Sequence, residues 1–96
     1  MGRQEVLDIL RAHFPEMQRS GVRRLAVFGS TARDEATRDS DVDILVEFHG
    51  PATLNGFMDL NFLLEDLLGK RVDLVTVAAL KPAMRDAVLR EAVDVS

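Results

Sequence analysis

The sequence predicts an α/β domain in which a small mixed three-stranded sheet is covered by helices. Three short runs rich in apolar and β-branched residues predict strands over residues 23–28, 42–48 and 71–76. Segments with apolar residues at helical spacing alternate with these runs. The predicted order is α-β-α-β-α-β-α, which is typical of two-layer domains.

The first predicted helix covers residues 3–13, where apolar residues recur at helical spacing. Pro15 favours the first turn of a second short helix, which Gly21 then ends, because proline is tolerated at helix starts and glycine at helix ends. After the first strand, residues 31–36 predict one or two helical turns.

Two further helices are predicted in the second half of the chain. Apolar residues recur at helical spacing over residues 53–68, and Gly69 ends that helix. Pro82 begins the last helix, along which Ala83, Ala87 and Glu91 lie on successive turns. Glu91 is interpreted as an ordinary solvated position of this helix.

Length and composition predict one domain over residues 1–96. The chain has 47% hydrophobic and 29% charged residues and no cysteine, which excludes disulfides, thiol nucleophiles and cysteine-based zinc sites. No apolar run is long enough for a membrane span, and no signal-peptide pattern precedes the first helix, so a cytoplasmic protein without a membrane partner is expected. The net charge of −4 weighs against direct nucleic-acid binding.

A phosphate site is predicted where the first strand ends. Gly29-Ser30 follows that strand, and a Gly-Ser turn that leads into helical residues can hold phosphate oxygens on its backbone N–H groups. After ten intervening residues Ser30 is followed by Asp41 and then Asp43. Because side chains alternate along a strand, these two carboxylates share one face and can hold a hard cation.

A third carboxylate interrupts the last apolar strand at Asp73. Placing it beside Asp41 and Asp43 creates like-charge repulsion, which bound cations would relieve. Two Mg²⁺ ions would both relieve this repulsion and grip the phosphates of a substrate.

These features closely resemble the minimal nucleotidyltransferases of the DNA-polymerase-β-like superfamily, the small antitoxin partners of HEPN-domain toxins. The resemblance rests on the Gly29-Ser30 and Asp41-Val42-Asp43 motif with its flanking strands, and on the later segments 67–75 and 89–93. It therefore covers nearly the whole chain, and it implies a minimal polymerase-β-like core.

The resemblance also implies roles for individual residues. Gly29 and Ser30 would bind the phosphates of ATP, with Arg33 as a phosphate or partner contact beside them. Asp41, Asp43 and Asp73 would hold two Mg²⁺ ions, and Asp73 would help to deprotonate the attacking hydroxyl. Family members of this type transfer AMP to a tyrosine of the HEPN toxin and so silence its RNase activity.

One departure from the family pattern bears on the phosphate site. Related sequences usually carry glycine where this chain has Asp34. A carboxylate that faced the phosphates would weaken nucleotide binding, whereas one that points to solvent would be harmless.

The leading hypothesis is an Mg²⁺-dependent adenylyltransferase that modifies a HEPN-domain toxin, and the alternative is an antitoxin that neutralises its partner sterically. The acidic cluster favours the enzyme, since a steric binder has no need for carboxylates that cost stability. The hypothesis of transfer to a small molecule is the weakest of the three, because enzymes of that type use an additional domain to hold the acceptor. The acceptor side of the cleft is therefore expected to come from another protein in a hetero-oligomer.

Overall fold

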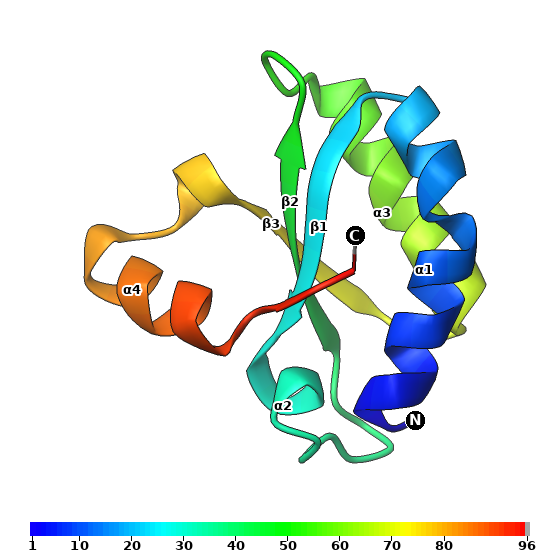
Figure 1. Cartoon of the computed structure of the whole chain (residues 1–96), viewed down its shortest axis with the longest axis vertical. Coiled ribbons are helices and arrows are strands. Elements are labelled where there is room, and N and C mark those ends of the chain that lie inside the picture. Colours follow the sequence, from blue (N-terminus) through cyan, green and yellow to red (C-terminus); the bar gives the residue numbers. More distant parts are fainter. Residues whose placement is uncertain (96) are drawn as a thin grey trace.

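A computed structural model describes residues 1–95 of the chain, in which helices pack on a four-stranded sheet (Figure 1). Within these residues no helix is long and apolar enough to cross a membrane. The elements in chain order are α1 (Arg3–Arg19), β1 (Val22–Phe28), α2 (Gly29–Ala32), β2 (Val42–Phe48), α3 (Leu54–Leu68), β3 (Val72–Thr76), the 3₁₀ helix η1 (Val77–Ala79), α4 (Pro82–Glu91) and β4 (Val93–Asp94).

The sheet is mixed, as predicted, and its strand order is β3-β2-β1-β4. Strand β2 is parallel to β3 and antiparallel to β1, and β4 pairs antiparallel with the other edge of β1. The prediction of three strands was wrong in number, because β4 is a fourth. It contains only two residues and pairs with two residues of β1, so no apolar run in the sequence indicates it.

The helices cover the two faces of the sheet unequally. Helices α1 and α3 lie side by side on one face, whereas the short α4 lies on the other (Figure 1). Alternation along β2 follows this division: Val42, Ile44 and Val46 are buried beneath α1 and α3 in the main core. The opposite face is hereafter called the open face, and it carries a smaller apolar cluster of Ala26, Leu45, Leu80 and Val88.

Helix α1 runs through Pro15 without a break, so the prediction of two helices in this region was wrong. Phe14 and Met17, on either side of Pro15, are both buried in the main core. Each buried side chain of this size stabilises the fold by about 1.5–3 kcal/mol, which together exceeds the ~3 kcal/mol cost of an interior proline. Tertiary packing therefore overrides the local preference of the chain.

Candidate active site

The predicted phosphate turn lies where β1 ends and α2 begins. Gly29 has φ +70°, in the left-handed region that favours glycine. A Cβ atom built at Gly29 would also overlap the Asp43 carboxylate, whose residue pairs with Phe28 in the neighbouring strand. Any side chain at this position would push the turn and the carboxylate apart. Glycine thus allows the turn backbone to lie directly against Asp43.

Two of the three predicted carboxylates lie side by side on adjacent strands. Asp43 of β2 pairs in register with Asp73 of β3, and parallel neighbouring strands direct such paired side chains to the same face. Partial burial raises the pKa of Asp43 above its ordinary value, and the nearby charges of Asp73 and Asp41 raise this pKa further. The open face therefore concentrates negative charge beside Gly29.

Asp41 lies beside this pair but is held by a different partner. Its Oδ1 atom is 3.2 Å from Nε of Arg71, which directly precedes β3. Over residues 1–95, no three or more carboxylate, imidazole or thiol groups are arranged to hold a metal ion. The structure thus brings Asp43 and Asp73 together and leaves Asp41 in an ion pair at the edge of the same site.

The donor set nevertheless fits a hard divalent cation. Carboxylate oxygens are the ligands that Mg²⁺ prefers. Burial is the main cause of the raised pKa of Asp43, and a cation between Asp43 and Asp73 would remove the charge repulsion that adds to it. The Asp41–Arg71 pair is an exposed ion pair, of a kind that contributes only ~0–1 kcal/mol. The Asp41 carboxylate is therefore held only weakly by Arg71.

Ser30 and Arg33 flank the turn, as the sequence predicts. Ser30 lies in the first turn of α2, directly after Gly29, and is partly exposed. The next residue, Thr31, is buried, and its hydroxyl has no hydrogen-bond partner within residues 1–95. Arg33 ends α2, and its side chain is about half exposed. The hydroxyl of Ser30 therefore lies at the start of α2, and the guanidinium of Arg33, at its end, pairs with Glu91 and Glu35.

Glu91, at the end of α4, is a site residue that the sequence analysis missed. Its Oε1 accepts a hydrogen bond from the Gly29 backbone N–H at 2.9 Å, and its Oε2 accepts one from Nη1 of Arg33 at 2.9 Å. The hydrogen bond from Glu91 is the main cause that raises the pKa of Arg33. The interpretation of Glu91 as an ordinary solvated position was therefore wrong.

A sequence signal for Glu91 did exist. Glu91 follows Ala87 and Val88 at helical spacing, so it continues the side of α4 that packs toward the sheet. A carboxylate on such a stripe needs a partner, and here the partners are Gly29 and Arg33.

Asp34, the departure from the family pattern, directs its carboxylate to the N-terminus of α1. Its backbone has φ +58°, a left-handed conformation that glycine adopts freely and aspartate tolerates. Its Oδ1 accepts a hydrogen bond from the Arg3 backbone N–H at 2.9 Å, at the N-terminus of α1. Asp34 thus ties α1 to the chain beyond α2.

Comparisons with known proteins establish the family of the chain. The family described as nucleotidyltransferase domain matches residues 4–95. The chain belongs to the nucleotidyltransferase family. This nucleotidyltransferase is 50% identical over 91 residues to the protein adenylyltransferase MntA of Thermococcus cleftensis, a match that covers 94% of this chain and 92% of that protein.

Solved structures support the same assignment. A structure described as a candidate minimal nucleotidyltransferase is 43% identical to this nucleotidyltransferase, with a TM-score of 0.85, and the match covers 97% of this chain and 95% of that one. A tri-AMPylated Shewanella oneidensis HEPN toxin in complex with MNT antitoxin matches with a TM-score of 0.67 at 16% identity, over 94% of this chain and 71% of that one. At that identity the second match shows a shared fold.

Proposed function

We propose that this nucleotidyltransferase is an Mg²⁺-dependent protein adenylyltransferase that acts as an antitoxin. It transfers AMP from ATP to a hydroxyl group, that of a tyrosine, on a HEPN-domain toxin and so neutralises the RNase activity of that toxin. The relative from Thermococcus cleftensis is named a protein adenylyltransferase, and the complex from Shewanella oneidensis pairs an AMPylated HEPN toxin with an MNT antitoxin of the same fold.

One observation carries the proposal: the backbone of the Gly29 turn lies directly against a pair of adjacent carboxylates, Asp43 and Asp73. Nucleotidyl transfer requires this neighbourhood, because the phosphates must be held while the negative charge on their oxygens is neutralised, which cations held by the carboxylates would do. A purely steric antitoxin would gain nothing from two like charges at this spacing, which cost stability.

The residues divide the work between phosphate binding and charge control. The Ser30 hydroxyl and the backbone N–H groups that follow Gly29 hold the β and γ phosphates, since the Gly29 N–H itself donates to Glu91, and Arg33 adds positive charge beside them. Asp41, Asp43 and Asp73 would hold Mg²⁺, which supplies Lewis-acid neutralisation of the phosphates when bound. Asp73, which is the more exposed of the paired carboxylates Asp43 and Asp73, accepts the proton of the attacking hydroxyl.

Intact mass spectrometry tests this proposal. The protein encoded in the neighbouring reading frame, where a HEPN-domain partner is expected, is incubated with this chain, ATP and Mg²⁺. The expected result is a mass gain of one or more adenylyl groups that disappears with Asp43→Asn. Asp66→Asn is the matched control, because Asp66 is an exposed carboxylate on α3, which covers the other face of the sheet.

The possible outcomes separate the two antitoxin hypotheses. A stable complex without any mass gain would replace the enzyme by a steric antitoxin. A mass gain that persists with Asp43→Asn would show that transfer occurs but that the carboxylate assignment is wrong.

A further inference from the structure

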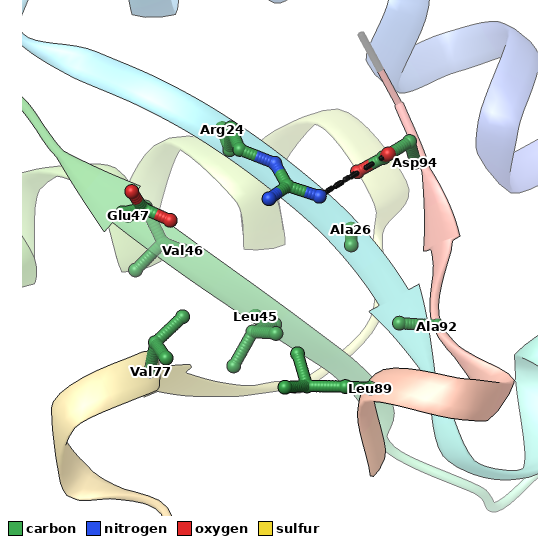
Figure 2. A pocket seen from close by; sticks show the side chains of 9 residues that line it. All are labelled: Arg24, Ala26, Leu45, Val46, Glu47, Val77, Leu89, Ala92 and Asp94. Atoms are coloured by element: carbon green, nitrogen blue, oxygen red, sulfur yellow. Dashed lines mark hydrogen bonds and ion pairs between the residues drawn. The ribbon is translucent and has the colours of Figure 1, made fainter. Parts of the chain in front are cut away.

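A cavity of about 240 Å³ lies on the open face of the sheet (Figure 2). Ala26 of β1 and Leu45 of β2 form its floor, and Leu89 and Ala92, from α4 and the residue after it, form one wall. Val77 of η1 lines the opposite side. The residues predicted to bind nucleotide or metal do not line this cavity, so the proposed function does not yet use it.

The strand register fixes where this cavity lies relative to the reacting groups. Phe28 pairs with Asp43, Ala26 pairs with Leu45, and the next pair on this face is Arg24 with Glu47. Each two-residue step along a strand covers roughly 6.6 Å. Along the open face the order is therefore the Gly29 turn, the carboxylates and then the cavity.

This order matches the geometry that nucleotidyl transfer requires. In an in-line displacement the attacking and leaving oxygens lie on opposite sides of the reacting phosphorus. With the β and γ phosphates held at the Gly29 turn, pyrophosphate leaves toward the turn. The attacking oxygen must then approach from the side of Leu45, where the cavity opens.

We propose that this cavity binds the acceptor side chain, a phenolic side chain contributed by the partner protein, with its hydroxyl directed at Asp43 and Asp73. This inference rests on the proposed function and names the acceptor subsite within it. The phenolic oxygen forms a bond to the α-phosphorus of ATP as the bond to the α,β-bridging oxygen breaks. Pyrophosphate leaves with that electron pair, and the phenolic proton passes to the Asp73 carboxylate.

The lining of the cavity suits an aromatic ring better than a nucleoside. Its volume lies below the roughly 300–1,000 Å³ of sites that bury whole small molecules or cofactors, so it is sized for one side chain. The strand residues nearest the carboxylates, Ala26 and Leu45, are apolar, whereas the far end of the cavity carries charged side chains. The lining contains no aromatic ring on which a base could stack. At the outer rim Arg24 pairs with Asp94, with 3.2 Å between Nη2 and Oδ1. The backbone of an entering segment would therefore meet polar groups at this rim.

The wall of the cavity is fastened to the phosphate turn. Glu91 lies between the two wall residues Leu89 and Ala92, and it accepts hydrogen bonds from Gly29 and Arg33. Nucleotide turn and acceptor cavity are therefore built on one connected unit, in which a bound ring keeps a fixed position relative to the phosphates.

Leu89 offers a direct test, since its side chain lines the cavity and is 45% exposed. Leu89→Glu places a charge in the cavity wall with little risk to folding. Met84→Glu is the matched control, because Met84 is another exposed apolar residue of α4, at 55% exposure, and lies outside the cavity. Both variants are first checked for an unchanged affinity for AMP-PNP with Mg²⁺.

The probe is N-acetyl-L-tyrosinamide, titrated into ¹⁵N-labelled chain saturated with AMP-PNP and Mg²⁺. We expect the probe to change amide chemical shifts only at the cavity, at Ala26, Leu45 and Ala92. The apparent affinity obtained from these changes should fall at least ten-fold with Leu89→Glu and stay the same with Met84→Glu. Shift changes elsewhere, none at millimolar probe, or an equal response in both variants would overturn the proposal. A loss of AMP-PNP affinity with Leu89→Glu would assign the cavity to the nucleoside instead.

The same variants keep this inference distinct from the proposed function. If the wild-type chain adenylylates the HEPN-domain partner and Leu89→Glu does so equally well, the acceptor cavity is wrong and the enzyme assignment stands. If the wild-type chain transfers no AMP while the probe still binds in the cavity, the proposed function fails instead.

Discussion

The two faces of the sheet carry opposite kinds of residue on the same strands. On the face beneath α1 and α3, Leu25, Ile44 and Val46 are fully buried in one continuous apolar core. On the open face the same strands carry the half-buried Asp43 beside the smaller apolar cluster that includes Ala26. The covered face therefore stabilises the fold, whereas the open face holds charge and incompletely covered apolar surface for binding.

The open face is therefore suited to bind molecules that this chain does not supply. Adjacent carboxylates and a partly open apolar cavity both reduce stability unless a cation or another molecule completes them. Substitutions on the two faces should therefore have separable effects: those on the covered face should change unfolding, and those on the open face should change binding and transfer.

The largest difference in stability is expected from a pair of leucines. Leu10 of α1 is fully buried in the main core, and Leu89 of α4 is 45% exposed. Leu10→Ala removes buried methyl groups and leaves a cavity, so it should lower the free energy of unfolding by about 2–5 kcal/mol. Leu89→Ala should change it by no more than about 0.5 kcal/mol. Urea denaturation measures both, and similar losses would contradict the division between the faces.

A smaller effect, on binding rather than stability, is expected at Ser30. Ser30→Ala should weaken ATP binding by about 1–3 kcal/mol if the hydroxyl donates a hydrogen bond to a charged phosphate oxygen. The free energy of unfolding should stay nearly unchanged, since the side chain is partly exposed. Isothermal titration with AMP-PNP and Mg²⁺ measures the affinity. An unchanged affinity would remove Ser30 from the phosphate site.

A further comparison tests the fastening of α4 to the turn. Both Glu91 and Glu35 pair with Arg33, but Glu91 is the less exposed of the two and also accepts the Gly29 N–H. Glu91→Ala should therefore lower the melting temperature more than Glu35→Ala. Differential scanning calorimetry compares the two variants, and an equal shift would mean that the Gly29 hydrogen bond contributes nothing.

Much of the fold could be predicted because alternation along strands is a local property. In β2 the apolar residues Val42, Ile44 and Val46 indicate the buried face directly, and the neighbouring Asp43 thereby falls on the open face. The same parity placed Asp73 on that face. Its pairing with Asp43 followed from the expectation of one site for both, and the register of β2 with β3 shows them adjacent.

The missed features depend on contacts between residues far apart in the sequence. Strand β4 is two residues long and is held by Arg11, whose side chain donates to the Val95 and Asp94 carbonyls from the other end of the chain. Glu91 lies 62 residues from Gly29, its hydrogen-bond donor. Helical spacing with Val88 indicates the side of α4 on which Glu91 lies, but no local pattern identifies Gly29 as its partner. The continuity of α1 through Pro15 likewise depends on what its neighbours bury.

The smallest expected effect is a pH dependence that distinguishes the open face in the absence of metal. The pKa of Asp43 is raised above its ordinary value of 3.8 in the folded chain, mainly by burial. Between these two pKa values the native state holds a proton that the unfolded chain has released, so this group makes unfolding easier as the pH rises. Above both values the penalty is constant.

Asp43→Asn removes that penalty. With EDTA present, the free energy of unfolding of the variant minus that of the wild type should therefore increase as the pH rises from 3.8 and then stay constant. Urea denaturation across pH measures the difference, with Asp66→Asn as the control that should show no such gain. Adding Mg²⁺ should reverse the order, because a ligand that binds only the native wild type stabilises it. If Mg²⁺ left both proteins unchanged, the carboxylates of the open face would not be a cation site, and their cost to stability would lack the function proposed for it.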